Sequence, residues 1–129
     1  DIIEFRHTLT TGIGPATLDG GNGNDTILAQ PTFSGTSTAT GGRGNDIIAI
    51  TSVPPLYGTG SSYLLSGGAG DDTLTGGASI DTVDGGRGDD FIDVRGGGAD
   101  TVTCGAGNDV VLYDASDTVS GDCETASLS

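Results

Sequence analysis

Apolar residues recur along the chain at fixed distances from five glycine-rich segments. One series, here called the first ladder, follows the last aspartate of each segment by two positions and includes one residue near the N-terminus: Ile3, Ile27, Ile48, Leu74, Ile92 and Val111. A second ladder precedes each segment by two positions and ends on one further residue: Leu18, Ala39, Leu65, Val83, Val102 and Val119. Each of the five glycine-rich segments separates a member of the second ladder from a member of the first by the same nine-residue step.

Each apolar position of the first ladder is the middle residue of a three-residue stretch, such as TIL (26–28) or FID (91–93). Successive side chains of a strand point to opposite faces, so the middle residue of each stretch is expected to face inward. Two such strands and their turns form one coil of about 18 residues. Coils stacked about 4.8 Å apart would form two parallel sheets. The pattern therefore predicts an all-β parallel solenoid with a thin aliphatic core.

The connections that lead from the first ladder back to the second are unequal in length. Three long ones cover residues 4–16, 29–37 and 50–63, and the later ones are shorter. We therefore expect one domain over residues 1–129, with loop-inserted coils over 1–64 and regular repeats over 65–121. Because functional residues concentrate on loops that a rigid scaffold carries, these connections are a hypothetical recognition surface or a contact area for a neighbouring domain. They contain Arg6, His7, Phe33, Tyr57 and Tyr63. Neutral insertions are an equally open interpretation.

Composition shows that a conventional core is not available to this chain. Of 129 residues, 33% are hydrophobic, 25 are glycine, and Met and Trp are absent, so large side chains cannot fill an interior. Four basic residues against 18 acidic ones give a net charge of −14, which argues against nucleic acid as a partner and favours cations. No apolar run approaches the length of about 18 residues that a membrane span needs.

The five segments share one pattern of glycines around an aspartate. They are GGNGND (20–25), GGRGND (41–46), GGAGDD (67–72), GGRGDD (85–90) and CGAGND (104–109). With the apolar residue that follows, they resemble the G-G-x-G-x-D-x-U-x nonapeptide of the RTX, or hemolysin-type, calcium-binding repeat family. The resemblance implies a right-handed parallel β-roll that binds several Ca²⁺ ions in its turns.

Calcium chemistry explains why glycine and aspartate alternate in these turns. Ca²⁺ takes about 6–8 oxygen ligands from carboxylates and backbone carbonyls. Glycine adopts positive φ without steric cost, so that a short turn can point several carbonyls inward. Stacked aspartates would repel one another by about 1 kcal/mol per neighbour in water, more at lower dielectric. A divalent ion between successive turns converts that repulsion into bridging.

Three groups of residues are candidate calcium ligands. The first is a column of motif aspartates on one edge: Asp1, Asp25, Asp46, Asp72, Asp90 and Asp109. The second is a shorter column on the opposite edge, whose turns depart from the pattern: Asp81, Asp100 and Asp117. The resemblance implies backbone carbonyls of the second and fourth motif positions as further ligands: Gly21, Gly23, Gly42, Gly44, Gly68, Gly70, Gly86, Gly88, Gly105 and Gly107.

Two alternatives to metal ligation stay open for these carboxyl and amide groups. Asp81 and Asp100 could instead hydrogen-bond within their own turns. The fifth motif positions are predicted to be turn formers rather than ligands, since Asn and Asp tolerate a left-handed backbone. These positions are Asn24, Asn45, Asp71, Asp89 and Asn108.

The two cysteines predict a covalent cap at the end of the array. Cys104 and Cys123 are 19 residues apart, which is one coil, so they are expected to lie above one another and form a disulfide. A disulfide that closes a loop of that size stabilises the folded state by about 3 kcal/mol in the chain-entropy model. We expect this cap over residues 104–123, and an oxidising compartment for the protein.

These observations predict a calcium-binding structural module of a secreted or cell-surface protein that folds on binding Ca²⁺. An enzyme is not expected, because the single histidine has no plausible nucleophile nearby and no apolar pocket raises the pKa of a carboxyl group. Alternatives are a module that recognises carbohydrate or protein through the long connections, and the accessory module of a secreted enzyme. The outward threonines of the second strands also look like the face of ice-binding solenoids, although threonine is common on exposed strands.

Overall fold

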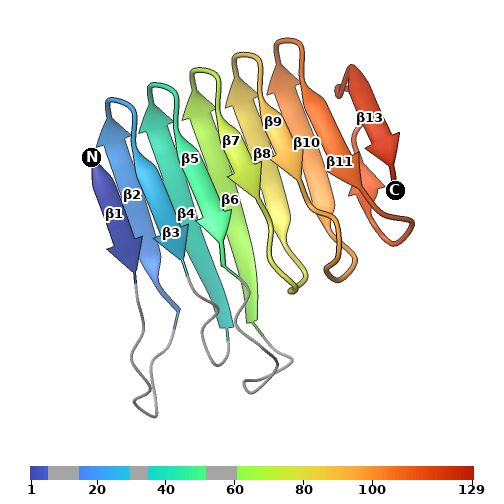
Figure 1. Cartoon of the computed structure of the whole chain (residues 1–129), viewed down its shortest axis with the longest axis horizontal. Helices are drawn as coiled ribbons and strands as arrows, with labels where there is room; N and C mark the ends of the chain where they lie inside the picture. Colours follow the sequence, from blue (N-terminus) through green and yellow to red (C-terminus); the bar gives the residue numbers. More distant parts are fainter. Residues whose placement is uncertain (6–14, 30–34, 52–60) are drawn as a thin grey trace.

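The computed structural model describes residues 1–5, 15–29, 35–51 and 61–129 of the chain (Figure 1). Thirteen strands and no helix occur within those ranges. The strands are β1 Ile2–Phe5, β2 Thr17–Asn22, β3 Thr26–Ala29, β4 Gly35–Arg43, β5 Ile47–Ile50, β6 Ser61–Ala69, β7 Thr73–Thr75, β8 Thr82–Arg87, β9 Phe91–Asp93, β10 Thr101–Ala106, β11 Val110–Tyr113, β12 Thr118–Val119 and β13 Thr125–Leu128. Among the described residues, no helix is long and apolar enough to cross a bilayer.

The strands form two parallel sheets that alternate along the chain. One sheet has the order β1-β3-β5-β7-β9-β11-β13, and the other has the order β12-β10-β8-β6-β4-β2. Each coil contributes one strand to each sheet, so the chain winds as a parallel β-solenoid. The glycine-rich turns lie along one edge, which is the upper edge in Figure 1. This architecture confirms the all-β solenoid that the spacing of apolar residues predicts.

Both predicted ladders are confirmed by the strand register. Each member of the first ladder pairs with the next, from Ile3 with Ile27 through to Ile92 with Val111. The second ladder is likewise continuous from Leu18 to Val119. The members from Ile27 to Val111 on one sheet and from Ala39 to Val102 on the other are at most 2% exposed. The core is therefore a single layer of aliphatic side chains between two sheets.

The core also contains residues that the three-residue strand pattern does not predict. The first sheet has a second inward position two residues after the ladder, filled by Ala29, Ile50 and Val94, each at most 4% exposed. Strand β13 adds a further coil, because Val111 pairs with Ala126. This last turn is seven residues long, from Val119 to Ala126, instead of nine, so the repeat count misses it.

The long connections are shorter than predicted, because β4 and β6 extend into them. The prediction placed Tyr63 on a loop at a recognition edge, but Tyr63 lies within β6 and is 2% exposed. The prediction was wrong here because the serine-rich flank of β6 pairs in register with β4. Arg6, His7, Phe33 and Tyr57 lie outside the described residues, so the recognition hypothesis stays a prediction.

The outer face of the second sheet carries the predicted row of hydroxyl side chains. Thr17 pairs with Thr38, and Thr82 with Thr101, so that the threonines of successive coils are in line. Leu64, which is 45% exposed, lies between Thr38 and Thr82 in that line. The face is ordered but interrupted, and ice binding stays a prediction.

Because the core is thin, we expect two adjacent isoleucines to differ in their contribution to stability. Ile48 is fully buried in the first ladder, whereas Ile47 points outward and is 47% exposed. Replacing Ile48 with Ala should lower the free energy of unfolding by about 2–5 kcal/mol, through lost burial and a residual cavity. Ile47→Ala is the matched control, and its effect should stay within about 1 kcal/mol. Denaturant unfolding at constant calcium measures both, and equal losses would contradict the assignment of the core.

Candidate metal centre

The turns that connect the second sheet to the first depend on glycine backbone geometry. The glycines at the second and fourth positions of all five motifs have positive φ, from 93° at Gly21 to 154° at Gly107. A residue with a Cβ is strained at positive φ, so only glycine forms this turn without a conformational cost. A Cβ on Gly42 would also collide with the carbonyl oxygen of Gly21 in the preceding coil. The glycines that the sequence analysis singled out therefore set both the shape of each turn and the close approach between coils.

The fifth motif positions form a ladder between coils. The side-chain Oδ1 of Asn24 accepts a hydrogen bond from the N–H of Asn45 (2.9 Å), and Oδ1 of Asn45 accepts one from Asp71 (3.0 Å). Asp71 and Asp89 continue the same pattern toward Asn108. The left-handed backbone that motivated the turn-former prediction does not occur at these residues, since no described residue other than glycine has positive φ. Their side chains instead tie each turn to the next.

The motif aspartates form a buried row of hydrogen bonds, in which the donor and acceptor coils are reversed relative to the fifth-position residues. From Asp46 to Asp109, each Oδ1 accepts the backbone N–H of the aspartate one coil earlier. For example, the N–H of Asp25 donates to Asp46 (2.8 Å), and the N–H of Asp46 donates to Asp72 (2.7 Å). The next two steps, to Asp90 and Asp109, have the same geometry at 2.8 Å. Five carboxylates from Asp25 to Asp109 are thereby stacked on one edge, each at most 2% exposed.

The second oxygen of each of these carboxylates is buried and has no hydrogen-bond partner. These atoms are Oδ2 of Asp25, Asp46, Asp72, Asp90 and Asp109. Burial raises the pKa of Asp72 and of Asp90 to about 6, with a further contribution from neighbouring aspartate charges and an opposing one from backbone N–H donors included in that value. Such groups are stable as anions only with a cation or a donor beside them. The column fits a bound cation.

In the four motifs that begin with glycine, the missing side chain of that glycine leaves room for the cation. A Cβ on Gly85 would lie 2.6 Å from Oδ2 of Asp90 and 2.5 Å from the carbonyl oxygen of Cys104 in the next coil. Gly20 has the same surroundings, with Oδ2 of Asp25 at 2.9 Å and the carbonyl oxygen of Gly41 at 2.5 Å. A carboxylate oxygen and a carbonyl oxygen from successive coils therefore converge on one point. Oxygen ligands of this kind suit a hard cation such as Ca²⁺.

Asp1 differs from the other members of its predicted column. The register of β1 and β3 places Asp1 one coil before Asp25, but the Asp1 side chain is 98% exposed. The backbone nitrogen of Asp1 lies 2.8 Å from Oδ1 of Asp25, which repeats the contact of the other coils. The structure thus aligns Asp1 with the column without bringing its carboxylate into the interior.

The three aspartates of the opposite edge have different environments. Both oxygens of Asp81 accept backbone N–H groups, from Tyr63 (2.9 Å) and Gly77 (3.0 Å). Both oxygens of Asp117 also accept N–H groups, from Asp100 (3.0 Å) and Asp114 (2.8 Å). Two of the three predicted ligands are therefore already satisfied by the protein.

Asp100 has one oxygen free for a further partner. Its Oδ1 accepts the N–H of Asp81 (2.7 Å), whereas its buried Oδ2 has no hydrogen-bond partner. Burial, with nearby negative charge, raises the pKa of Asp100 to about 7. A Cβ on Gly97 would lie 3.2 Å from this Oδ2, 2.8 Å from the carbonyl oxygen of Gly77 and 3.0 Å from that of Ser79. Oxygens from two coils converge here as they do on the main edge.

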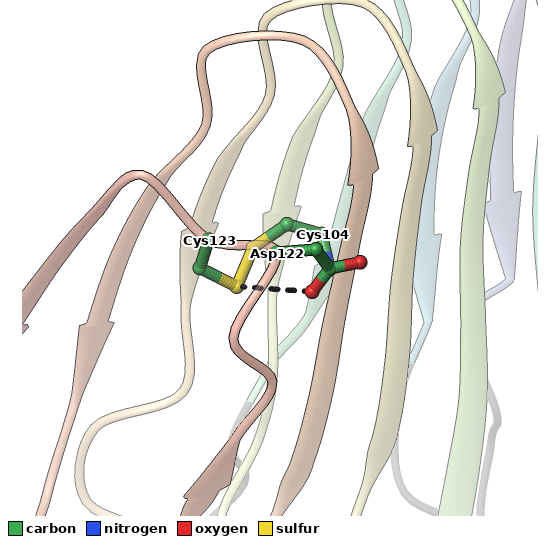
Figure 2. Close-up of side chains that lie close together, drawn as sticks. All are labelled: Cys104, Asp122 and Cys123. Atoms are coloured by element: carbon green, nitrogen blue, oxygen red, sulfur yellow. Dashed lines mark hydrogen bonds between the residues drawn. A yellow bond between two sulfur atoms is a disulfide. The ribbon is translucent and has the colours of Figure 1, made fainter.

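The predicted disulfide is confirmed and closes the last coil. Cys104 and Cys123 are bonded, with their Cα atoms 5.2 Å apart (Figure 2). Asp122 lies beside the bridge, and its Oδ2 accepts the N–H of Gly105 (3.0 Å). The two sulfurs and the Asp122 carboxylate lie within 4.8 Å of one another, but the sulfurs bond to each other and supply no thiolate.

Sequence reasoning missed one carboxylate of the main column. Oε2 of Glu124 accepts the N–H of Asp109 (3.0 Å), as each motif aspartate does for the coil before it. Val110 pairs with Thr125, so Glu124 occupies the next position after Asp109. The signal was present, because Glu124 stands two positions before Ala126, which pairs with Val111 of the first ladder. The shorter turn and the change from Asp to Glu hid it.

The chain matches the model of a known protein family over most of its length. The RTX calcium-binding nonapeptide repeat matches in four copies, over residues 8–30, 32–49, 66–97 and 96–111, which together cover more than half of the chain. No curated protein and no solved structure matches the chain.

The converging oxygens predict the effect of a single methyl group. Gly85→Ala would place a Cβ against Asp90 Oδ2 and the Cys104 carbonyl, without requiring a positive φ. We expect its calcium affinity to fall by about tenfold or more, as for changes that displace metal ligands. Gly121→Ala is the control, since its Cβ would meet nothing within 4 Å. Calorimetric calcium titration compares the two variants, and unchanged affinity in Gly85→Ala would rule out a metal at this point.

Proposed function

Because the chain belongs to the RTX calcium-binding nonapeptide repeat family and is therefore a calcium-binding structural module, we propose that it folds when Ca²⁺ fills its stacked turns. The observation that carries this proposal is the column of five buried carboxylates, each with an oxygen that no protein donor satisfies. A folded column of that kind without cations would hold like charges out of water. Calcium binding and folding are therefore expected to be one process.

The ligands proposed for the main edge are the carboxylates of Asp25, Asp46, Asp72, Asp90 and Asp109. Bound Ca²⁺ supplies positive charge and a set of vacant coordination positions for oxygen. Carbonyl oxygens complete each site, and the second and fourth motif glycines are the proposed donors, together with the first residue of the following motif. The first-residue carbonyl is supported by its convergence with Asp90 Oδ2 at Gly85.

For the opposite edge we propose one site, at Asp100. Its unpaired Oδ2 and the carbonyl oxygens of Gly77 and Ser79 surround one point, which supports this assignment. Asp81 and Asp117 are proposed to be structural, because backbone N–H groups already bind both oxygens of each. A carboxylate that caps amide groups stabilises its turn without a metal.

The proposed place of action is outside the cell. Ligands that bind only the folded state stabilise it by RT ln(1 + [L]/Kd), so a chain that is loose at low calcium folds where calcium is abundant. The Cys104–Cys123 disulfide is compatible with an oxidising compartment. The module is proposed to act as a calcium-dependent spacer or adhesion element rather than through catalysis.

The proposal predicts that chelation unfolds the module. In millimolar calcium, far-ultraviolet circular dichroism should show the strand content of two parallel sheets. Excess EDTA should remove most of it, because the stacked carboxylates then repel one another without compensation. Readdition of Ca²⁺ should restore the spectrum, and Mg²⁺ should do so poorly, since it demands tighter octahedral geometry. Strand content that stays unchanged in EDTA would refute calcium-dependent folding.

Removing one negative charge from the column of motif aspartates is expected to lower calcium affinity more than removing one from the outer face of a sheet. Asp46→Asn keeps an oxygen to accept the Asp25 N–H but removes the negative charge beside the proposed ion. We expect calcium affinity to fall by about tenfold or more. Asp19→Asn removes the same charge from the exposed outer face of β2 and should change affinity by less than about twofold, by loss of long-range attraction alone. Equal effects would mean that only net charge matters.

A further inference from the structure

The C-terminal segment from Asp122 to Glu124 lies against the last glycine-rich turn, where the repeat pattern ends. We propose that this segment completes a terminal calcium site, in which Glu124 and Asp109 are the carboxylate ligands and the Cys104–Cys123 disulfide holds the segment in place. The inference rests on the proposed function, because it extends the same column of carboxylates by one position.

Glu124 has the same place in the backbone as a motif aspartate. Its Oε2 accepts the N–H of Asp109 at 3.0 Å, which continues the series of aspartate-to-amide contacts on this edge. The pairing of Val110 with Thr125 gives it the same register. The longer side chain of glutamate compensates for a turn that is two residues shorter than the others. Glu124 therefore brings a carboxylate to the position where a further motif aspartate would stand.

Asp109 supplies an oxygen that faces this segment. Its Oδ2 is buried and without a hydrogen-bond partner, and the residue is 0% exposed. In the four earlier motifs, a single Cβ on the first glycine would touch both the Oδ2 of that motif and a carbonyl of the following coil. The unpaired oxygen of each motif is thus positioned next to the coil that comes after it. For Asp109 that coil is the one formed by Ser120 to Glu124.

The segment is held against the last turn by bonds other than the Glu124 contact. Cys123 is bonded to Cys104 (Figure 2). The Asp122 carboxylate accepts the N–H of Gly105 at 3.0 Å and that of Cys104 at 3.4 Å. These contacts fix the residues on both sides of the bridge. Glu124, which follows Cys123 directly, is thereby presented to Asp109 before any ion binds. Preorganisation of this kind lowers the cost of assembling a metal site.

The terminal site is expected to be weaker than the inner ones. Its first motif position is Cys104, whose Cβ occupies the point that glycine leaves open in the other four motifs. Glu124 is also exposed to solvent, whereas the motif aspartates are buried. Both differences reduce the number of fixed oxygens around an ion. This site should be the last of the main edge to fill as calcium rises.

Native mass spectrometry of the oxidised chain across a calcium series tests the proposal. The wild-type chain should bind one more Ca²⁺ at saturation than Glu124→Gln, which retains an acceptor for the Asp109 N–H but lacks the charge. Asp84→Asn, on the exposed outer face of β8, is the control for net charge and should bind as many ions as wild type. If Glu124→Gln binds the same number of ions as Asp84→Asn with the same affinities, the terminal site does not exist. If the wild type binds no calcium, the proposed function fails instead.

A second measurement tests the role of the disulfide. Hydrogen exchange of the Asp109 amide should slow when calcium fills the terminal site, and this protection should need calcium about tenfold higher or more in Cys104→Ser/Cys123→Ser. Protection at the Asp46 amide, which lies in the middle of the column, is the internal control and should keep its calcium dependence. Equal calcium dependence of Asp109 protection with and without the disulfide would contradict the proposed positioning role of the bridge.

Discussion

The structure depends on how like charges are accommodated along one edge of the solenoid. Five carboxylates lie in a row at the spacing of stacked strands, about 4.8 Å, and all are removed from water. Each has one oxygen without a hydrogen-bond partner, and the other oxygen is bound to a backbone amide in all but Asp25, where it contacts the N-terminal ammonium of Asp1. Coulomb repulsion at that distance is about 1 kcal/mol in water and several times larger in a less polar medium. Cations between the turns are the simplest physical solution.

The rest of the fold follows from that constraint. The hydrophobic core is one layer of aliphatic side chains, too thin to outweigh the burial of so many charges by itself. The turns need glycine where two coils approach and where a side chain would occupy the space of an ion. The apolar core and the proposed metal ions therefore act together. The two apolar ladders align the coils, and the proposed ions stabilise the edge on which the carboxylates meet. At Asp81 and Asp117, backbone amides bind both oxygens of the carboxylate, so the protein itself supplies their partners.

Periodicity predicted the repeating part of the molecule well, because a constant nine-residue step leaves only one register. Both apolar ladders and the disulfide between Cys104 and Cys123 were predicted from spacing alone and are confirmed. The burial of Tyr63 was not predicted, because the extension of β6 depends on pairing with β4 rather than on a local pattern. The fifth-position ladder was also missed, since its hydrogen bonds join residues from different coils.

The sequence predicted which residues are candidate ligands, but not which of their oxygens are hydrogen-bonded and which are left for a metal. Sequence spacing identifies Asp81, Asp100 and Asp117 as equivalent, yet only Asp100 has an unpaired buried oxygen. That difference depends on which backbone amides each turn exposes, which composition does not specify. Glu124 was hidden for a related reason, since a two-residue deletion and a longer side chain together reach the position that the repeat would give to aspartate.

The most direct test of the central claim is a crystal structure of the chain grown in calcium, with anomalous difference density measured along both edges. If Ca²⁺ bridges the turns, a row of peaks will lie about 2.3–2.6 Å from the unpaired Oδ2 atoms of Asp25, Asp46, Asp72, Asp90 and Asp109. Turns stacked as they are here, with carboxylates buried and no metal beside them at saturating calcium, would contradict it.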